Sequence, residues 1–275
     1  MNDTYSKLVN CQKDLLYLIK CVDGICAKHN IKYSLDAGTM LGAVREKGFI
    51  PWDDDADIVF LREEYIKFLD AIKNIELPDN IGLYKPEDKD KFLDFNCRLY
   101  IKDKILKDDE YSLKYYDGIF SHATLDLYVL DEIPSDSFKN RFFVFKQQLV
   151  FGLAMSKREE ITYSKYGLIE KIAIFILSKI GIFFSTKKLC EMHDHVSMSH
   201  YKKGYKKVYG TSWAPTYPKY QYDKKDFEDL IKVPFEDAEL PIPKNYDKIL
   251  RYDYGDDYMK PIKTHEHSGD FVKNI

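Results

Sequence analysis

The sequence predicts an α+β fold, in which a β-sheet with flanking helices fills the first half and helices dominate the second half. Three apolar runs rich in β-branched and aromatic residues, at 56–61, 95–103 and 123–133, are typical of strands. Residues 108–116 lack such a pattern and are expected to form a loop or excursion. The last 70 residues are rich in Tyr, Pro and charge, which indicates a partly irregular wrap.

Apolar residues at helical spacing predict helices over 5–28 and 63–75, and the pattern stays mainly helical from 137 to about 200. The change of pattern predicts two regions. Residues 1–136 form the core with the sheet, and residues 137–275 form a helical region and an irregular C-terminal segment that pack on this core.

Composition narrows the class of protein. The chain has 275 residues, 45% of them hydrophobic, and a formal net charge of −3, which is ordinary for one large or two small globular domains. A general nucleic-acid binder would carry a basic excess, so no nucleic-acid partner is expected. Five cysteines without zinc-type spacing, after a polar N-terminus with no signal peptide, predict reduced thiols in the cytoplasm.

One apolar segment, residues 171–184, approaches the length of a membrane span but is broken by Lys179. The preferred interpretation is a helix buried in the core. The alternative is a helix at a membrane interface, because Lys187, Lys188 and the basic stretch 202–207 could meet anionic lipid.

The stretch from 31 to 48 predicts a strand, a turn and a short helix. Residues 31–37 are expected to be extended, and Gly38 and Thr39 to form the turn. Thr39 suits the N-cap of a helix over 40–47, which Gly48 would end.

Four aspartates then fall within five positions, immediately before the strand at 56–61. In an extended chain Asp53, Asp55 and Asp57 share one face, about 7 Å apart in succession, and Asp54 points to the other. Like charges so close raise one another's pKa and destabilise the fold unless a cation neutralises them. Carboxylate oxygens suit Mg²⁺, with Mn²⁺ as a possible substitute.

Three competing roles for the acidic run fit less well. A solvated acidic turn conflicts with the neighbouring Trp52 and the apolar run, which should be buried. An EF-hand counted from Asp53 matches at several positions, but Ile58 stands where the loop needs Gly and Pro51 prevents an entering helix. A phosphatase-like nucleophile would follow an apolar strand, whereas here the strand follows the aspartates.

A phosphate-transfer site accounts for the arrangement better. Gly38 would let a phosphate approach the backbone, and Thr39 would lie at a helix N-terminus, which favours anions. Asp55 and Asp57 would hold a metal that bridges phosphates. Asp126, on a later strand, would complete the metal site or accept the acceptor's proton, although a plain strand-end charge is the alternative.

These segments resemble the LicD family of phosphotransferases, which is related to fukutin and fukutin-related proteins. GTMLGAVREKGFIPWDDDADI (38–58) is similar to the family signature, and 125–131 and 254–267 are similar to its later landmarks. Ala37 departs from it, since the family commonly has a second Gly there. The resemblance implies a nucleotidyltransferase-like mixed β-sheet core and Mg²⁺-dependent transfer of a substituted phosphate from a cytidine-diphosphate conjugate to a sugar hydroxyl.

The resemblance also implies roles for the aspartates. Asp55 and Asp57 become metal ligands, and Asp126 becomes the candidate base or a further ligand. Asp53 becomes a third or outer carboxylate at the substrate-binding side of the site. Asp54, on the other face, receives no catalytic role.

Phosphate transfer needs positioning and charge neutralisation, so arginines are candidate clamps. Arg45 and Arg98 are the two candidates, with a structural ion pair as the alternative for each. Residues 254–259 are expected to fold back over the site. His265 and His267 could bind metal by spacing alone, but as tail residues they are expected at most to form hydrogen bonds at its edge.

The expected function is Mg²⁺-dependent transfer of phosphocholine from CDP-choline to a cell-surface glycan, of the teichoic acid, lipopolysaccharide or capsule type, or to its lipid-linked precursor. The partners are therefore a CDP-linked donor and a glycan acceptor, and the location is the cytoplasm, at the inner face of the membrane if the protein associates with it peripherally. Phosphoglycerol, phosphoribitol or phosphoethanolamine transfer, nucleotidyl transfer from a triphosphate, and a non-catalytic binding role remain alternatives. The sequence leaves the acceptor, the head group and the oligomeric state open.

Overall fold

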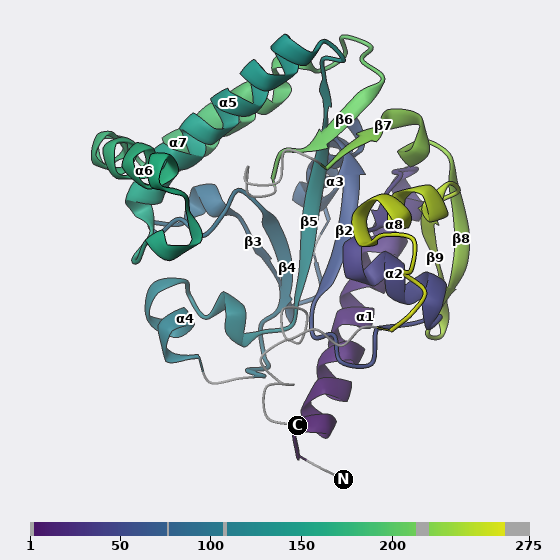
Figure 1. Ribbon diagram of the computed structural model, residues 1–275. Coiled ribbons are helices and arrows are strands. Elements are labelled where there is room, and N and C mark those ends of the chain that lie inside the picture. Colours follow the sequence, from purple (N-terminus) through teal and green to yellow (C-terminus); the bar gives the residue numbers. More distant parts are fainter. Residues whose placement is uncertain (1–2, 76, 107–108, 213–219, 262–275) are drawn as a thin grey trace.

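The computed structural model describes residues 3–75, 77–106, 109–212 and 220–261, and its centre is a mixed sheet of seven strands (Figure 1). The strands are β1 (Ser34–Leu35), β2 (Ala56–Leu61), β3 (Ile81–Tyr84), β4 (Cys97–Ile101), β5 (Thr124–Ile133), β6 (Lys207–Gly210) and β7 (Gln221–Asp223). Five follow the order β1-β2-β5-β4-β3, while β6 pairs with the end of β5 and with β7. Because β2 and β5 are parallel and the other pairs antiparallel, the predicted α+β fold with a mixed sheet is confirmed.

Eight α-helices and a separate hairpin surround the sheet in the described part of the chain. The helices are α1 (Asp3–His29), α2 (Ala37–Arg45), α3 (Arg62–Lys73), α4 (Glu110–Tyr115), α5 (Ser137–Ala154), α6 (Leu168–Gly181), α7 (Thr186–Ser197) and α8 (Tyr246–Tyr254). The hairpin consists of β8 (Leu230–Phe235) and β9 (Ala238–Pro243). Figure 1 shows α5, α6 and α7 together on one side of the sheet, and α2, α8 and the hairpin on the other.

The main core lies between the sheet and helices α1 and α3, which both pack against β5. The apolar positions of α1 recur at helical spacing, and Leu15, Leu18 and Val22 are completely buried. Along β5, Leu125 and Leu127 are also completely buried, whereas the intervening Asp126 is partly exposed. Since neighbouring strand residues point to opposite faces, Asp126 lies on the face away from this core.

A second, smaller core joins α5, α6 and α7 into a helical module, residues 137–197. Its buried members include Phe92 from the loop before β4, Phe151 of α5 and Leu189 of α7. Residues 171–184 form most of α6, as predicted, but the expectation that they are buried is wrong, because most of their large apolar side chains are exposed.

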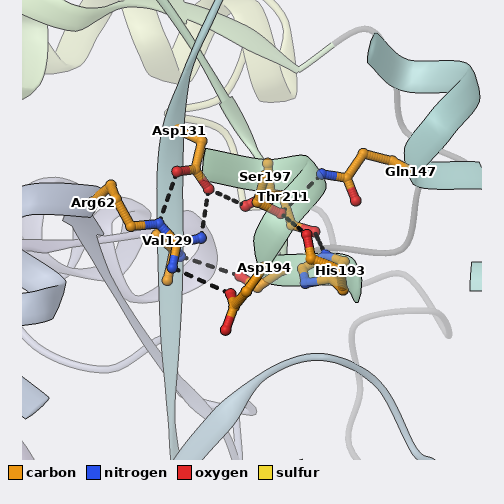
Figure 2. A network of polar contacts seen from close by, with 9 residues as sticks. Arg62, Val129, Asp131, Gln147, His193, Asp194, Ser197 and Thr211 are labelled. Atoms are coloured by element: carbon orange, nitrogen blue, oxygen red, sulfur yellow. Dashed lines mark hydrogen bonds and ion pairs between the residues drawn. The ribbon is translucent and has the colours of Figure 1, made fainter. Parts of the chain in front are cut away.

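A buried polar network fastens α7 to the sheet (Figure 2). Arg62, the first residue of α3, donates from Nε and Nη2 to the two carboxylate oxygens of Asp131 on β5, at 2.7 and 2.6 Å. Thr211, which follows β6, donates its hydroxyl to the same carboxylate, and its carbonyl contacts His193 of α7 at 2.9 Å. Arg62 also reaches Asp194 of α7 at 3.4 Å. The network therefore joins α3, β5, α7 and the segment after β6 around the buried Arg62–Asp131 ion pair.

Several regions are more regular than the sequence predicted. Residues 108–116, expected as a loop or excursion, contain α4, and the C-terminal region, expected as a partly irregular wrap, contributes β6 to β9 and α8. Strands β6 and β7 belong to the main sheet, so the sheet includes strands from both sides of the predicted boundary at residue 136. Strand β3 was not predicted.

None of the five cysteines, all of which lie within the described ranges, forms a disulfide, and Cys11, Cys26, Cys97 and Cys190 are buried. This agrees with the prediction of reduced thiols, and the buried ones pack as small apolar side chains. Among the described residues, no helix combines the length and apolarity that crossing a bilayer requires.

Candidate active site

Strand register brings the predicted carboxylates into one row across the sheet. Asp57 on β2 is the direct partner of Asp126 on β5, Asp126 is the partner of Arg98 on β4, and Arg98 is the partner of Tyr84 on β3. Partners on adjacent strands have their Cβ atoms about 5 Å apart and on the same face. The structure therefore brings Asp57 and Asp126 together, although 68 positions separate them in the sequence.

Only Asp57 of the four clustered aspartates belongs to the strand. β2 begins at Ala56, so Asp53, Asp54 and Asp55 lie in the loop before it and outside the strand. Asp55 is exposed and Asp53 is half-buried. That Asp53, Asp55 and Asp57 share one face stays a prediction.

The row continues past β2 to a residue that sequence analysis missed. β1 ends at Leu35, and the backbone N–H of Asp36 donates to the carbonyl of Asp57 at 3.0 Å. The Asp36 side chain is buried, and its Oδ2 has no hydrogen-bond partner among the described residues. Burial, followed by the charge of Asp253, raises the pKa of Asp36 to about 7. The available signal was an acidic residue at the end of a strand, immediately before the Ala-Gly-Thr turn.

Helix α2 begins earlier than predicted, which changes the role of Thr39. The residue that precedes the helix is Asp36, and Thr39 lies buried inside the first turn, so Thr39 is not an N-cap. Its hydroxyl instead accepts a hydrogen bond from the backbone N–H of Asp57 at 2.9 Å. Thr39 thus fixes the first turn of α2 against the strand that carries Asp57.

Gly38 lies directly beside the acidic loop. A Cβ added at Gly38 would stand 3.0 Å from Oδ2 of Asp53, a contact tighter than normal packing. Glycine therefore leaves room for the Asp53 carboxylate next to the N-terminus of α2, where the helix dipole favours negative charge. This is the place at which the sequence predicts a phosphate, and the role of Gly38 in binding it stays a prediction.

Ala37 occupies a left-handed backbone conformation, with φ of 45°. Such a conformation is unfavourable for alanine and costs glycine nothing. Ala37→Gly should therefore raise the free energy of unfolding by about 0.5–1 kcal/mol, measured by urea unfolding. Ala43→Gly in the interior of α2 is the matched control and should lower it by about 1 kcal/mol or more. A loss of stability in Ala37→Gly would contradict the inference that the backbone at Ala37 is strained.

The carboxylates act on one another strongly. Removal from water raises the pKa of Asp57 well above its usual range, and the neighbouring carboxylates add to the rise; these are Asp55, Asp126, Asp36 and Asp53. Burial and then the charge of Asp55 raise the pKa of Asp53 as well. The site therefore holds more negative charge than its own surroundings compensate, which is the electrostatic condition that attracts a cation.

Arg98 compensates part of that charge. Its Nε lies 2.7 Å from Oδ1 of Asp126, and its Nη1 and Nη2 donate to the two carboxylate oxygens of Asp94 at 2.9 and 2.6 Å. Tyr128 also donates its hydroxyl to Asp126, at 3.2 Å. Arg98 is buried and paired on two sides, so it orients Asp126 directly, and its role as a phosphate clamp stays a prediction.

Arg45 makes two contacts of a different kind. Its Nε donates to Glu46 at 2.7 Å, and its Nη1 donates to the carbonyl of Tyr258 at 3.2 Å. Arg45 therefore fastens the segment after α8 to the end of α2. The predicted role of Arg45 in binding phosphate stays a prediction.

The C-terminal segment reaches the acidic row through Tyr254, the last residue of α8. Burial raises the pKa of Tyr254, and the charges of Asp36 and Asp57 are the next causes. Tyr258 is buried and donates to Asp247 at 2.7 Å, while Asp256 and Met259 are exposed. His265 and His267 lie outside the described residues.

The donor set can be compared with what Mg²⁺ requires. Within the described ranges, no group of three or more His, Cys, Asp or Glu side chains is arranged as a complete metal site. Mg²⁺, however, is usually held by one or two carboxylates, with water and phosphate oxygens as its remaining ligands. The uncompensated oxygens beside Asp57, including the unpartnered Oδ2 of Asp36, fit such an open site.

The comparisons with known proteins cover the strands that carry this row. The model of the LicD/FKTN/FKRP nucleotidyltransferase domain matches residues 30–164, which contain β1 to β5 and every member of the carboxylate row. The lipopolysaccharide cholinephosphotransferase LicD of Haemophilus influenzae is 27% identical over 262 residues, covering 89% of this chain and 88% of the relative. The chain carries a LicD-family nucleotidyltransferase domain.

Two further matches are local. Uncharacterized proteins of Rickettsia typhi and Rickettsia prowazekii are 48% identical over 54 residues and 42% identical over 62 residues. These matches cover 20% and 22% of this chain, and 18% and 23% of the relatives. They show strong local similarity and carry no argument about the rest of the chain.

Proposed function

We propose that this protein, which carries a LicD-family domain, is a Mg²⁺-dependent phosphotransferase that moves phosphocholine from CDP-choline to a sugar hydroxyl. The acceptor is a cell-surface glycan, of the lipopolysaccharide, teichoic acid or capsule type, or its lipid-linked precursor. The observation that carries the proposal is the direct pairing of Asp57 with Asp126 beside the first turn of α2. The family and the cholinephosphotransferase in it support the choice of reaction and head group.

Asp55 and Asp57 are the residues that would hold Mg²⁺, or Mn²⁺ in its place. The bound ion would neutralise phosphate charge and orient the diphosphate. Asp57 is fixed by the hydrogen bond from its N–H to Thr39, whereas the exposed Asp55 can adjust its position. Asp53 would stay an outer carboxylate of the site, beside Gly38.

Asp126 is the candidate acceptor for the proton of the attacking hydroxyl. Arg98 and Tyr128 hold its carboxylate in one orientation, and the guanidinium favours its ionised form. Burial acts in the opposite direction and is the larger effect, so the pKa of Asp126 is raised above that of a free aspartate. A raised pKa makes a carboxylate a better base.

The atoms of the reaction balance without a redox step. The sugar oxygen forms a bond to the phosphorus that carries choline, the bond from that phosphorus to the bridging oxygen breaks, and CMP leaves. Asp126 takes the hydroxyl proton. Such a displacement depends on positioning and on charge neutralisation more than on a covalent nucleophile.

The alternative head groups are phosphoglycerol, phosphoribitol and phosphoethanolamine, and the alternative reaction is nucleotidyl transfer from a triphosphate. The proposed location is the cytoplasm, at the inner face of the membrane, where a lipid-linked acceptor would be presented. A role in binding without catalysis is the remaining alternative and would require that metal binds but no donor turns over.

A thermal-shift panel of CDP conjugates tests the choice of donor. A ligand at about 100 times its dissociation constant stabilises the native state by about 2.7 kcal/mol. We expect CDP-choline with Mg²⁺ to raise the melting temperature more than CDP-glycerol, CDP-ribitol, CDP-ethanolamine or CTP, and EDTA to remove most of the shift. A larger shift with CTP than with any diphosphate conjugate would favour nucleotidyl transfer.

A further inference from the structure

Helix α6 exposes a continuous apolar surface. Ile169, in the first turn of α6, is 82% exposed, and so is Phe183, which lies two residues after the end of the helix. The remaining large apolar residues of this surface, each at least 46% exposed, are Leu168, Ile172, Phe175, Ile176, Ile180 and Ile182. Within α6 these residues recur three and four positions apart, so they form one side of the helix. We call this side the α6 apolar face.

The opposite side of α6 packs inward and includes two small residues, Ser178 and Gly181. Its buried positions are Ile174, Ser178 and Gly181. A Cβ at Gly181 would stand only 2.0 Å from the carbonyl oxygen of Leu153, and one at Gly152 would stand 2.5 Å from the side chain of Leu177. Helices α5 and α6 therefore approach as closely as their backbones allow. The helix cannot turn its larger apolar residues inward, so the α6 apolar face is a fixed feature of the module.

The charge of the helical module points to the partner. Residues 137–197 contain 10 Lys and Arg and 5 Asp and Glu, whereas the whole chain has a net charge of −3. Basic groups lie against the exposed rings: Lys179 Nζ lies 5.6 Å from the ring centre of Phe175, and Lys146 Nζ lies 5.3 Å from that of Phe142 on α5. The excess positive charge is thus concentrated in the region that also exposes the apolar residues.

We propose that the α6 apolar face docks on an anionic phospholipid bilayer, with α6 lying in the plane of the headgroups. At 14 residues α6 is about 21 Å long, shorter than the hydrocarbon layer of about 30 Å, so it lies on the bilayer and does not cross it. Apolar side chains at the headgroup boundary and lysines on anionic lipid are the two forces that hold such helices. The docking itself does not depend on the proposed function. Only its purpose, which is to bring the enzyme to a lipid-linked acceptor, rests on that function.

Vesicle co-sedimentation of the full chain tests the docking. We expect binding to phosphatidylcholine vesicles that contain about 30% phosphatidylglycerol, weaker binding to pure phosphatidylcholine, and weakening by about 0.5 M salt. The variant Ile172→Asp/Ile176→Asp should lower the partition coefficient by about 100-fold or more. Lys179→Glu should lower it by about tenfold on the anionic vesicles alone.

Ile105→Asp is the matched control, because Ile105 is 61% exposed but lies outside the module, and it should bind as the wild type does. Circular dichroism and CMP release with soluble substrates should be unchanged in all these variants, which separates lost docking from lost folding or catalysis. Equal binding by the double variant and the wild type would overturn the proposal. So would a dimer in sedimentation that the double variant abolishes without any vesicle binding, since the occupant would then be a second copy of the chain.

Discussion

Asp57→Asn should lower CMP release from CDP-choline by about 10³-fold or more. Asparagine keeps the shape of the side chain but removes the charge that would hold the metal and balance the diphosphate. Asp57 is the one clustered aspartate within β2, where its N–H is bonded to Thr39 and its partner is Asp126, so no neighbour can take its position. The rate is measured with saturating Mg²⁺, donor and a glycan acceptor.

The stability of this variant provides an internal control. The raised pKa of Asp57 means that its charge opposes folding while no cation is bound, and that this penalty grows as the pH rises through the unfolded and then the folded pKa. Asp57→Asn should therefore melt at or above the temperature of the wild type in EDTA. Asp54 precedes the predicted ligand Asp55 in the sequence but has no predicted role, so Asp54→Asn should release CMP at a rate within a few-fold of the wild type. If Asp57→Asn released CMP at the rate of the wild type, the proposal that Asp57 is a metal ligand would be contradicted.

Asp131→Asn should lower the free energy of unfolding by about 3–5 kcal/mol. The Asp131 side chain is 1% exposed and that of Arg62 is 8% exposed, so the substitution leaves a buried guanidinium without its main counter-charge. Burial alone would lower the pKa of Arg62, and Asp131 is the largest opposing influence. A chain of this size should lose roughly 6–20 °C in melting temperature.

Two variants distinguish this buried pair from an ordinary surface one. Asp70→Asn removes the exposed pair of Asp70 with Lys73, 2.9 Å apart, and should change stability by less than about 0.5 kcal/mol. The double variant Arg62→Met/Asp131→Leu should regain much of the loss, because it leaves no uncompensated charge. Equal effects of Asp131→Asn and Asp70→Asn would contradict the role of the network in fastening α7 to the sheet.

The sequence predicted β2 and β5, with Asp57 and Asp126 on them, because these features depend on local pattern. The runs at 56–61 and 123–133 became β2 and β5 almost residue for residue, and the acidic residues within them marked Asp57 and Asp126. Their direct pairing depends on parallel register between distant strands, which no local pattern contains.

Several parts of the site depend on tertiary contacts and could not be predicted. The partners of Arg98 are Asp94 and Asp126, which only the fold of the loop before β4 and the β4–β5 pairing bring together. Asp36 gained its place because β1 stops after two residues and α2 begins at once. Thr39 is a residue type that commonly caps helices, but α2 begins before it, and its hydroxyl accepts a hydrogen bond from the N–H of Asp57.

The errors outside the site have similar causes. An apolar helix of 14 residues gives the same pattern whether its apolar side faces a core or a lipid surface, so the burial of α6 could not be decided from periodicity. The hairpin β8–β9 contains Pro234, Pro241 and Pro243, which weaken a strand pattern because proline lacks the N–H of the ladder.

The most direct test of the central claim is the mass spectrum of the acceptor after incubation with CDP-choline. Wild-type protein with Mg²⁺ should release one CMP for each phosphocholine that the glycan gains, and EDTA or Asp57→Asn should abolish both products. Pyrophosphate release from a triphosphate, with no turnover of any CDP conjugate under the same conditions, would contradict the account.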